Sequence, residues 1–288
     1  MKTLIIKTGA LGDVLRTTCI LHALKGDIYW VTKNNAIPLL KDNPKIKKIL
    51  SINNTKKIEN KKFDLILSLD DGYKEAELAS KIKTKKLIGI KLENNNIIYT
   101  SETNEWNDMG LPSRFGKEKA DQLKKQNKKT FQELLFGFIN KKFNGEEYIL
   151  NIKSKIIKEK IIAIENRAGD RWPMKKWDKY GLLIKNLKLK GHKIKLLEQK
   201  DKLQDYVQDI NECDTLVCGD TLAMHIGLAL GKKVIAIFGP TSATEIYDYK
   251  RLKKIISPIE CQCCYKKECD KIPNCMNLIK LEDVLREI

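Results

Sequence analysis

The sequence lacks several features that mark whole classes of protein. No apolar run approaches the roughly 20 residues of a membrane-spanning helix, and the run Leu4–Ile6 is cut short by Lys7 and Gly9, too early for a secretory signal. No zinc-finger or RNP pattern occurs, and the basic stretches are not interleaved with aromatic residues as in single-strand binders. These absences favour a cytoplasmic protein that does not bind nucleic acid.

Acidic residues are too few to balance the basic ones. The 288 residues include 55 Lys and Arg against 37 Asp and Glu, a formal net charge of +18. Much of the excess is Lys scattered among Asn and Ile, which is typical of solvated surfaces and AT-rich coding. The alternative is attraction to an anionic partner, for which Lys117–Lys129 is the densest basic stretch.

Cysteines are rare until late in the chain, and six of the eight follow residue 217. In a reducing cytoplasm structural disulfides are not expected. Cys261, Cys264, Cys269 and Cys275 form a C-x2-C-x4-C-x5-C pattern, which suits a structural zinc ion and, less readily, an iron–sulfur cluster. Four thiols in a short span also pack without metal. A structural zinc site and packed free thiols are therefore both open.

The sequence does contain an alternation of short apolar strands and helical segments in both halves. Expected strands are 4–6, 28–31, 49–52, 65–69, 87–90, 161–164, 193–197, 215–218 and 234–238, and expected helices are 14–24, 36–41, 74–83, 131–143, 177–189, 203–210, 220–230 and 282–288. This order predicts an α/β protein with two doubly wound domains, residues 1–148 and 149–288. Between Lys91 and Thr130 the periodicity fails and a long irregular segment is expected.

The segment Thr215–Thr241 is the most informative, because it reads as a strand, a glycine, a helix and a second strand. The helix opens on Gly219, Asp220 and Thr221, and His225 lies one turn further on the same face. Backbone N–H groups at such a helix start attract anions. We expect these residues to bind a phosphate group, the alternative for the histidine being a structural role.

The N-terminus repeats this arrangement. Thr8, Gly9, Gly12 and Asp13 follow the first strand, and in an open α/β sheet that end of the strand faces the ligand crevice. A carboxylate there can act as general base on a hydroxyl group, and glycines permit close backbone approach to a ligand; alternatively Asp13 only stabilises its helix start. Two such units predict two Rossmann-like domains facing a central cleft.

A third candidate is the basic segment Glu165–Trp177, which carries Arg167, Arg171, Lys175 and Lys176 after a buried strand. Cations there suit a diphosphate leaving group, whose developing charge must be stabilised. Of these cations, we expect Arg171 to have the most fixed position, because it directly precedes Trp172 and Pro173. The alternative is an exposed basic loop anchored by its tryptophans.

Together these motifs resemble glycosyltransferase family nine, the ADP-heptose:lipopolysaccharide heptosyltransferases. The similarity rests on IIKTGALGDVLRTTCILHAL, RWPMKKW, VCGDTLAMHIGLALGKKVIAIFGPT and the cysteine tail with its closing helix. It implies the GT-B fold, with residues 1–148 holding the acceptor and residues 149–288 the nucleotide sugar. The chain departs from the family pattern at Leu222, where glycine is common, and at Arg171, where some members have lysine.

The resemblance implies an inverting glycosyltransferase that moves heptose from ADP-heptose to a lipopolysaccharide core or related cell-surface glycan. Asp13 becomes the catalytic base, with Thr8, Gly9 and Gly12 near the acceptor. The donor-binding residues become Arg171, Lys175, Glu198, Asp201, Gly219, Asp220, Thr221 and His225. No cofactor is required for transfer, because fixed dipoles and cations can stabilise the leaving diphosphate.

The acceptor would be an anionic glycolipid, reached by peripheral contact with the inner membrane. Two other hypotheses compete: a GT-B nucleotide-sugar epimerase, and a non-enzymatic basic module that binds nucleic acid with steep salt dependence.

Overall fold

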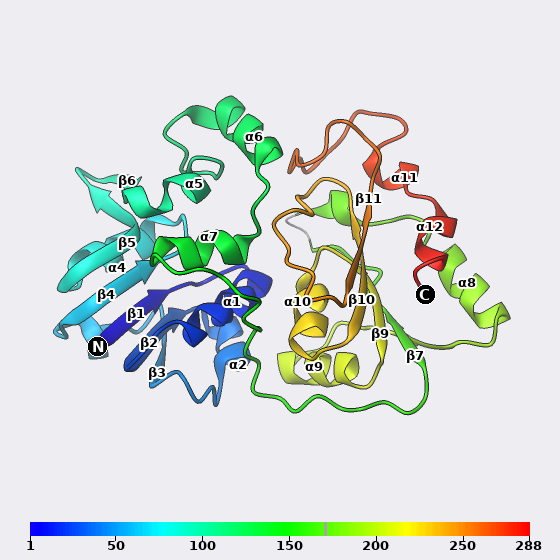
Figure 1. Cartoon of the computed structure of the whole chain (residues 1–288), viewed down its shortest axis with the longest axis horizontal. Coiled ribbons are helices and arrows are strands. Elements are labelled where there is room, and N and C mark those ends of the chain that lie inside the picture. Colours follow the sequence, from blue (N-terminus) through cyan, green and yellow to red (C-terminus); the bar gives the residue numbers. More distant parts are fainter. Residues whose placement is uncertain (170–171) are drawn as a thin grey trace. The chain divides into compact units, whose positions relative to one another are not determined.

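The computed structural model describes residues 1–169 and 172–288. It divides into two compact units, Met1–Asn151 and Ile152–Ile288, each built on its own sheet with helices beside it (Figure 1). The predicted α/β architecture of two doubly wound sheets is confirmed. The division falls between Asn151 and Ile152, against the boundary after residue 148 expected from sequence.

The first unit contains a six-stranded sheet in the order β3-β2-β1-β4-β5-β6. Its strands are β1 (Lys2–Ile6), β2 (Asp27–Thr32), β3 (Lys48–Ser51), β4 (Phe63–Ser68), β5 (Thr84–Glu93) and β6 (Asn96–Tyr99). β1 to β5 are parallel, and β6 runs antiparallel to β5. Strand order reverses between β1 and β4, and ligands of doubly wound folds bind outside the carboxyl ends of the strands at such a switch point.

Three helices of the first unit, α3, α5 and α6, were not expected from the sequence. The helices are α1 (Leu11–Thr17), α2 (Ile37–Leu40), α3 (Lys56–Glu59), α4 (Tyr73–Lys81), α5 (Asn104–Asn107), α6 (Gly116–Gln126) and α7 (Phe131–Phe138), with 3-10 turns at Thr18–His22, Asn34–Ala36 and Ser101–Thr103. The prediction of an irregular segment over 91–130 is wrong, since β6, α5 and α6 lie there. On α6 Ala120 is the one buried residue, so the helix lacks an apolar stripe to predict it from.

The predicted helix 131–143 is also too long. α7 ends at Phe138, and Asn140 takes a φ of 54°, in the left-handed region where a helix cannot continue.

Glycine is required at one position in this sheet. Gly89 of β5 has a φ of 110°, and a Cβ atom there would lie 1.9 Å from the Ser68 carbonyl oxygen at the end of β4. Any larger residue would both strain the backbone and overlap that oxygen. β4 and β5 therefore approach closely where β4 ends.

The second unit contains a five-stranded parallel sheet in the order β11-β10-β9-β7-β8. Its strands are β7 (Ile161–Ile164), β8 (Lys193–Leu196), β9 (Thr215–Gly219), β10 (Lys233–Phe238) and β11 (Leu252–Ile256); its helices are α8 (Tyr180–Leu189), α9 (Leu203–Asn211), α10 (Leu222–Ala229), α11 (Cys275–Leu278) and α12 (Leu281–Leu285), with a 3-10 turn at Pro173–Lys175. The sequence did not predict β11. Here strand order reverses between β7 and β9, so the second crevice is expected there.

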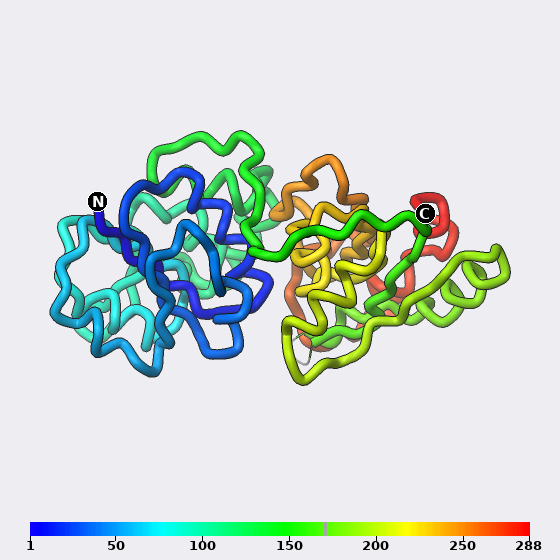
Figure 2. Tube along the Cα trace, turned by 90° about the horizontal axis from the view of Figure 1, so that it is seen from below, coloured from blue at the N-terminus to red at the C-terminus, as the bar shows by residue number. Residues whose placement is uncertain are grey.

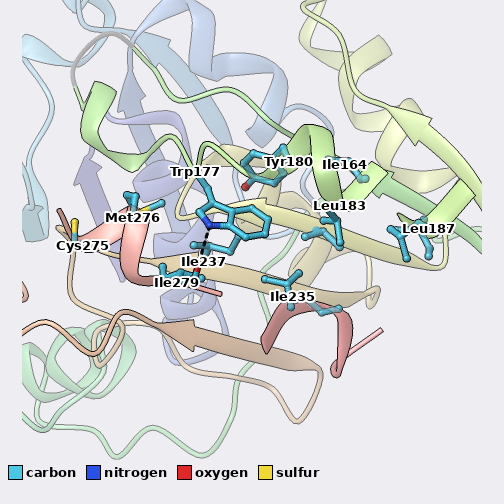
Figure 3. Close-up of a cluster of buried hydrophobic side chains, with 13 residues drawn as sticks. Ile164, Trp177, Tyr180, Leu183, Leu187, Ile235, Ile237, Cys275, Met276 and Ile279 are labelled. Carbon is cyan, nitrogen blue, oxygen red and sulfur yellow. Dashed lines mark hydrogen bonds between the residues drawn. The ribbon is translucent and has the colours of Figure 1, made fainter. Parts of the chain in front are cut away.

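The core of the second unit forms around Trp177, which is 1% exposed (Figure 3). Its Nε1 donates a hydrogen bond to the Ile279 carbonyl at 3.3 Å, and its ring meets Tyr180 edge-on at 5.2 Å. Met276 and Ile279 from the tail pack in the same cluster as Ile235 and Ile237 of β10. The tail is thus part of the core rather than a loose extension.

The segment between α7 and β7 contains no helix or strand, and Figure 2 follows it along the chain. Its first part belongs to the first unit, where Phe143 and Tyr148 are buried. Its last part belongs to the second, where Ser154 donates to the Leu230 carbonyl at 2.6 Å. None of the helices that the structure describes is long and apolar enough to cross a membrane.

Candidate functional site

Asp13 lies at the switch point of the first unit, on the first turn of α1. Its side chain is 33% exposed and both carboxylate oxygens have partners: Oδ2 accepts from the Ala10 N–H at 3.1 Å, and Oδ1 lies 2.9 Å from Arg16 Nη2. A carboxylate oxygen can accept more than one hydrogen bond, so this side chain is held in place and still faces solvent.

The loop before Asp13 is held by hydrogen bonds and an ion pair to two carboxylates that follow β4 in the chain. Lys7 forms a buried ion pair with Asp70 at 2.6 Å, and the Thr8 N–H donates to the same Asp70. The Thr8 hydroxyl donates to the buried Glu75 at 2.6 Å. Both donors of Thr8 are therefore used inside the unit. Gly9 is half-buried and Gly12 is buried in α1.

Asp70 and Glu75 were not singled out from the sequence. The available signal was the pair Asp70-Asp71 directly after a predicted strand, because the carboxyl ends of parallel strands meet at one edge of the sheet.

At the switch point of the second unit, β9 leads into α10 as predicted. Thr221 is the N-cap residue of α10, and its Oγ1 is buried without a hydrogen-bond partner among the described residues. His225 lies on the first turn of α10 and is 5% exposed. Gly231 follows the helix with a φ of 69°, as expected of a C-terminal glycine. A buried hydroxyl without a hydrogen-bond partner in the described part of the chain, at the positive end of a helix, suits an anionic ligand.

The side chain of Lys175 also lies at the start of α10, against Asp220. Its Nζ donates to the Asp220 carboxylate at 2.8 Å and to the Asp220 carbonyl at 2.9 Å. Burial alone would raise the pKa of Asp220, but the Lys175 ammonium and His225 outweigh it, so that the pKa of Asp220 lies below its usual value. Gly219 permits this approach, since a Cβ there would lie 3.3 Å from the Lys175 carbonyl oxygen.

A second charged cluster stands at the end of β7, and its carboxylate was missed from the sequence. Glu165 is 3% exposed and is bound by two guanidinium nitrogens of Arg167, at 2.8 and 2.6 Å. Tyr206 of α9 donates its hydroxyl to the same carboxylate. Burial first, and then the charge of Glu165, raises the pKa of Tyr206, and the bond to Glu165 raises the pKa of Arg167. The sequence identified Arg167 as a cation but gave no sign of its fixed partner.

The remaining predicted donor residues lie apart from these contacts or cannot be assessed. Glu198 and Asp201 are exposed in the loop between β8 and α9. That loop follows the strand next to β7. Arg171 lies outside the described residues. The structure therefore brings together Lys175, Gly219, Asp220, Thr221 and His225 from the predicted set.

The zinc interpretation of the cysteine tail is not supported. Cys261, Cys264, Cys269 and Cys275 line one small pocket, but no group of three or more His, Cys, Asp or Glu side chains in the described ranges is arranged to hold a metal ion. Burial and the neighbouring thiols raise the pKa of Cys275 to about 11. Cys275 is buried, and Cys261, Cys264 and Cys269 are half-buried.

Comparisons with known proteins point to one family. The model of glycosyltransferase family 9 (heptosyltransferase) matches residues 199–273. Lipooligosaccharide heptosyltransferase 2 of Campylobacter jejuni serotype O:6 is 33% identical over 105 residues, which are 35% of this chain and 33% of that protein. The match thus spans about a third of the length of that relative.

Solved structures extend the similarity of fold to the whole chain. The glycosyl transferase family 9 protein of Veillonella parvula aligns with a TM-score of 0.69 at 14% identity, over 99% of this chain and 95% of that one. The E. coli heptosyltransferase WaaC with ADP-2-deoxy-2-fluoro heptose aligns with a TM-score of 0.62 at 16% identity, over 99% and 98%. These chains share the GT-B fold of two Rossmann-like domains. The matched segment covers β9 and α10, so the similarity to glycosyltransferase family 9 includes the start of α10.

Proposed function

We propose that this protein is an inverting glycosyltransferase that transfers heptose from ADP-heptose to an anionic glycolipid, a lipopolysaccharide core or a related acceptor, in the cytoplasm. The observation that carries the proposal is the start of α10, where the buried Thr221 hydroxyl has no hydrogen-bond partner among residues 1–169 and 172–288, and Lys175 is bound to the neighbouring Asp220. The family match covers this segment, and the relatives are named for heptosyl transfer.

In this proposal the second unit binds the donor diphosphate. The N-terminus of α10 and the Thr221 hydroxyl donate to phosphate oxygens. An ammonium group has three N–H donors, of which Asp220 takes two from Lys175, so the third remains for the ligand. The negative charge that develops on the departing diphosphate is stabilised by these fixed groups. The proposal therefore needs no divalent metal for the transfer.

The first unit binds the acceptor and supplies the base. Asp13 takes the proton of the acceptor hydroxyl while that oxygen forms a bond to the anomeric carbon of the sugar. The bond from the same carbon to the diphosphate oxygen breaks, and ADP leaves with its electron pair. Attack from the face opposite the leaving group inverts the anomeric configuration.

A glycolipid acceptor requires contact with a membrane surface. Leu111 is 80% exposed and Phe115 51% exposed, directly before the lysine-rich α6. Exposed apolar side chains beside basic ones suit an anionic lipid surface. Co-sedimentation with anionic vesicles that is lost on Leu111→Ser with Phe115→Ser would support this route. Equal binding by the double variant would oppose it.

Two measurements test the function. Thermal shifts with ADP, UDP and GDP and their sugars should show selective stabilisation by the ADP compounds, and incubation with ADP-heptose and a truncated lipopolysaccharide core should release ADP and add one heptose to the acceptor. Preference for UDP or GDP would remove the ADP-heptose assignment. A donor isomerised without transfer would favour an epimerase.

A further inference from the structure

Arg16 is a buried cation for which the transfer reaction as described has no use. It lies on α1, three residues after Asp13, and its side chain is 9% exposed. Its Nη2 is 2.9 Å from Asp13 Oδ1. A guanidinium group loses much hydration on burial, so its retention here calls for a fixed partner and a definite orientation.

Two aromatic rings from other helices fix that orientation. The guanidinium carbon lies 4.0 Å from the centre of the Phe131 ring on α7 and 5.8 Å from that of Trp106 on α5. The two rings meet edge-on at 5.1 Å. Because cations are attracted to ring faces, Arg16 is held between this ring pair and the carboxylate of Asp13.

The ring pair is itself anchored. α7 begins with Thr130, whose hydroxyl accepts from the Glu133 N–H while the Glu133 carboxylate accepts from the Thr130 N–H. Such reciprocal caps fix the start of a helix. Trp106 and Phe131 also line a small pocket with Ser68 and Leu69 at the end of β4. The part of the chain between 91 and 144, to which the sequence gave no role, thus reaches the candidate base through Arg16.

We propose that Arg16 is the positioning residue of Asp13, an inference that rests on the proposed function. Arg16 holds Oδ1 while the Ala10 N–H holds Oδ2, so the plane of the proposed base is fixed. Arg16 itself neither gives nor takes a proton. In the transfer the proton moves from the acceptor oxygen to Asp13, and Arg16 keeps the carboxylate ionised until it does.

Three other charged side chains near this loop have partners of their own. Lys7 is paired with Asp70, and Glu75 accepts from Thr8. Lys33 approaches the loop at Gly9, where its Nζ would lie 3.8 Å from an added Cβ atom. Removal of Arg16 should therefore change the ionisation of Asp13 more than that of any other group in this loop, since an adjacent cation favours the charged form of a carboxylate.

The test compares Arg16→Met, Arg16→Lys and a matched control, Arg114→Met. Arg114 also pairs with an aspartate, Asp108 at 3.0 Å, and stacks on a ring, Phe115 at 4.8 Å. Misplacement of a catalytic group by about 1 Å can cost about 10²-fold in rate. We expect Arg16→Met to lower kcat roughly 10- to 100-fold with the donor KM little changed, and to move the acidic limb of the kcat profile to higher pH. Arg16→Lys should recover part of both effects, and Arg114→Met should behave as the wild type.

Phe131→Leu keeps the charge and removes the ring, and should lower kcat in the same direction by less; it serves if Arg16→Met fails to fold, as judged by its circular dichroism. A kcat for Arg16→Met within about twofold of wild type, or a loss without movement of the acidic limb, would overturn the assignment. Failure of the proposed function itself is distinct, because then the wild-type protein would transfer no sugar at all.

Discussion

The two units both carry a Gly-Asp pair after a central strand, yet the two aspartates are used differently. Asp13 stands inside the first turn of α1, 33% exposed, with Arg16 beside it. Asp220 stands before the start of α10, 16% exposed, and is locked by Lys175 through both its side chain and its carbonyl. The aspartate inside the first helical turn thus keeps a third of its side chain exposed, whereas the one before the helix is held against a lysine.

The largest effect should come from Asp13. Asp13→Asn removes the base but keeps the side-chain shape, and a general base contributes about 10²- to 10⁴-fold to rate, so we expect kcat to fall by about 10³-fold while ADP binding is unchanged. The measurement is initial-rate ADP release. Asp121→Asn is the matched control, since Asp121 is 34% exposed and also pairs with a cation on its own helix. A wild-type rate for Asp13→Asn would contradict the role of base.

Asp220 should instead matter for stability. Lys175→Met leaves a buried carboxylate unpaired, which typically costs about 3 kcal/mol, and urea unfolding of the second unit should shift accordingly. Asp220→Asn should cost less, and the double variant should cost less than the sum. Lys193→Met, which breaks the exposed pair with Glu159, should change the unfolding free energy by less than about 1 kcal/mol. If Lys175→Met and Lys193→Met lowered the unfolding free energy equally, the buried ion pair of Asp220 would not be special for stability.

The pH dependence of that stability follows from the lowered pKa of Asp220. Because the folded-state value lies below the ordinary value of 3.8, the contribution is fully present above pH 3.8 and is lost as the pH falls through the folded-state pKa. The stability gap between wild type and Asp220→Asn should be constant from pH 7 to 5 and shrink in more acidic solution. A gap that widens on acidification would show that Asp220 is not the ionised partner.

The smallest effect should separate ligand binding from stability. Thr221→Val replaces a hydroxyl that has no partner among the described residues, so the melting temperature of the free protein should not fall. One lost hydrogen bond to a charged ligand should weaken ADP binding by about 1.5 kcal/mol, or roughly tenfold. Calorimetric titration with ADP measures it. Unchanged affinity would place the diphosphate elsewhere.

Much of the fold could be predicted, because strands that are buried on both faces of a sheet appear in the sequence as continuous apolar runs. β1, β9 and β10 read as apolar runs since they are central strands, and the Gly-Asp motifs follow from them. β11 was missed because the consecutive residues Lys253 and Lys254 break the apolar run of this edge strand. α6 was missed because it buries almost nothing.

The site partners were harder to predict than the elements. Asp70 lies 63 residues from Lys7 and Tyr206 lies 41 from Glu165, so these contacts exist only through the order of the strands. The cysteine spacing was compatible with two outcomes, and spacing alone does not fix whether side chains converge on a metal.

The close contact of Gly89 with Ser68 limits which residues position 89 can accept. A methyl group at position 89 would occupy the space of the Ser68 carbonyl oxygen, and the end of β4 would have to move. Leu69 and Asp70 would move with it, and Asp70 holds both Lys7 and the Thr8 N–H. The geometry of the Asp13 loop thus depends on the absence of a side chain at Gly89, two strands away.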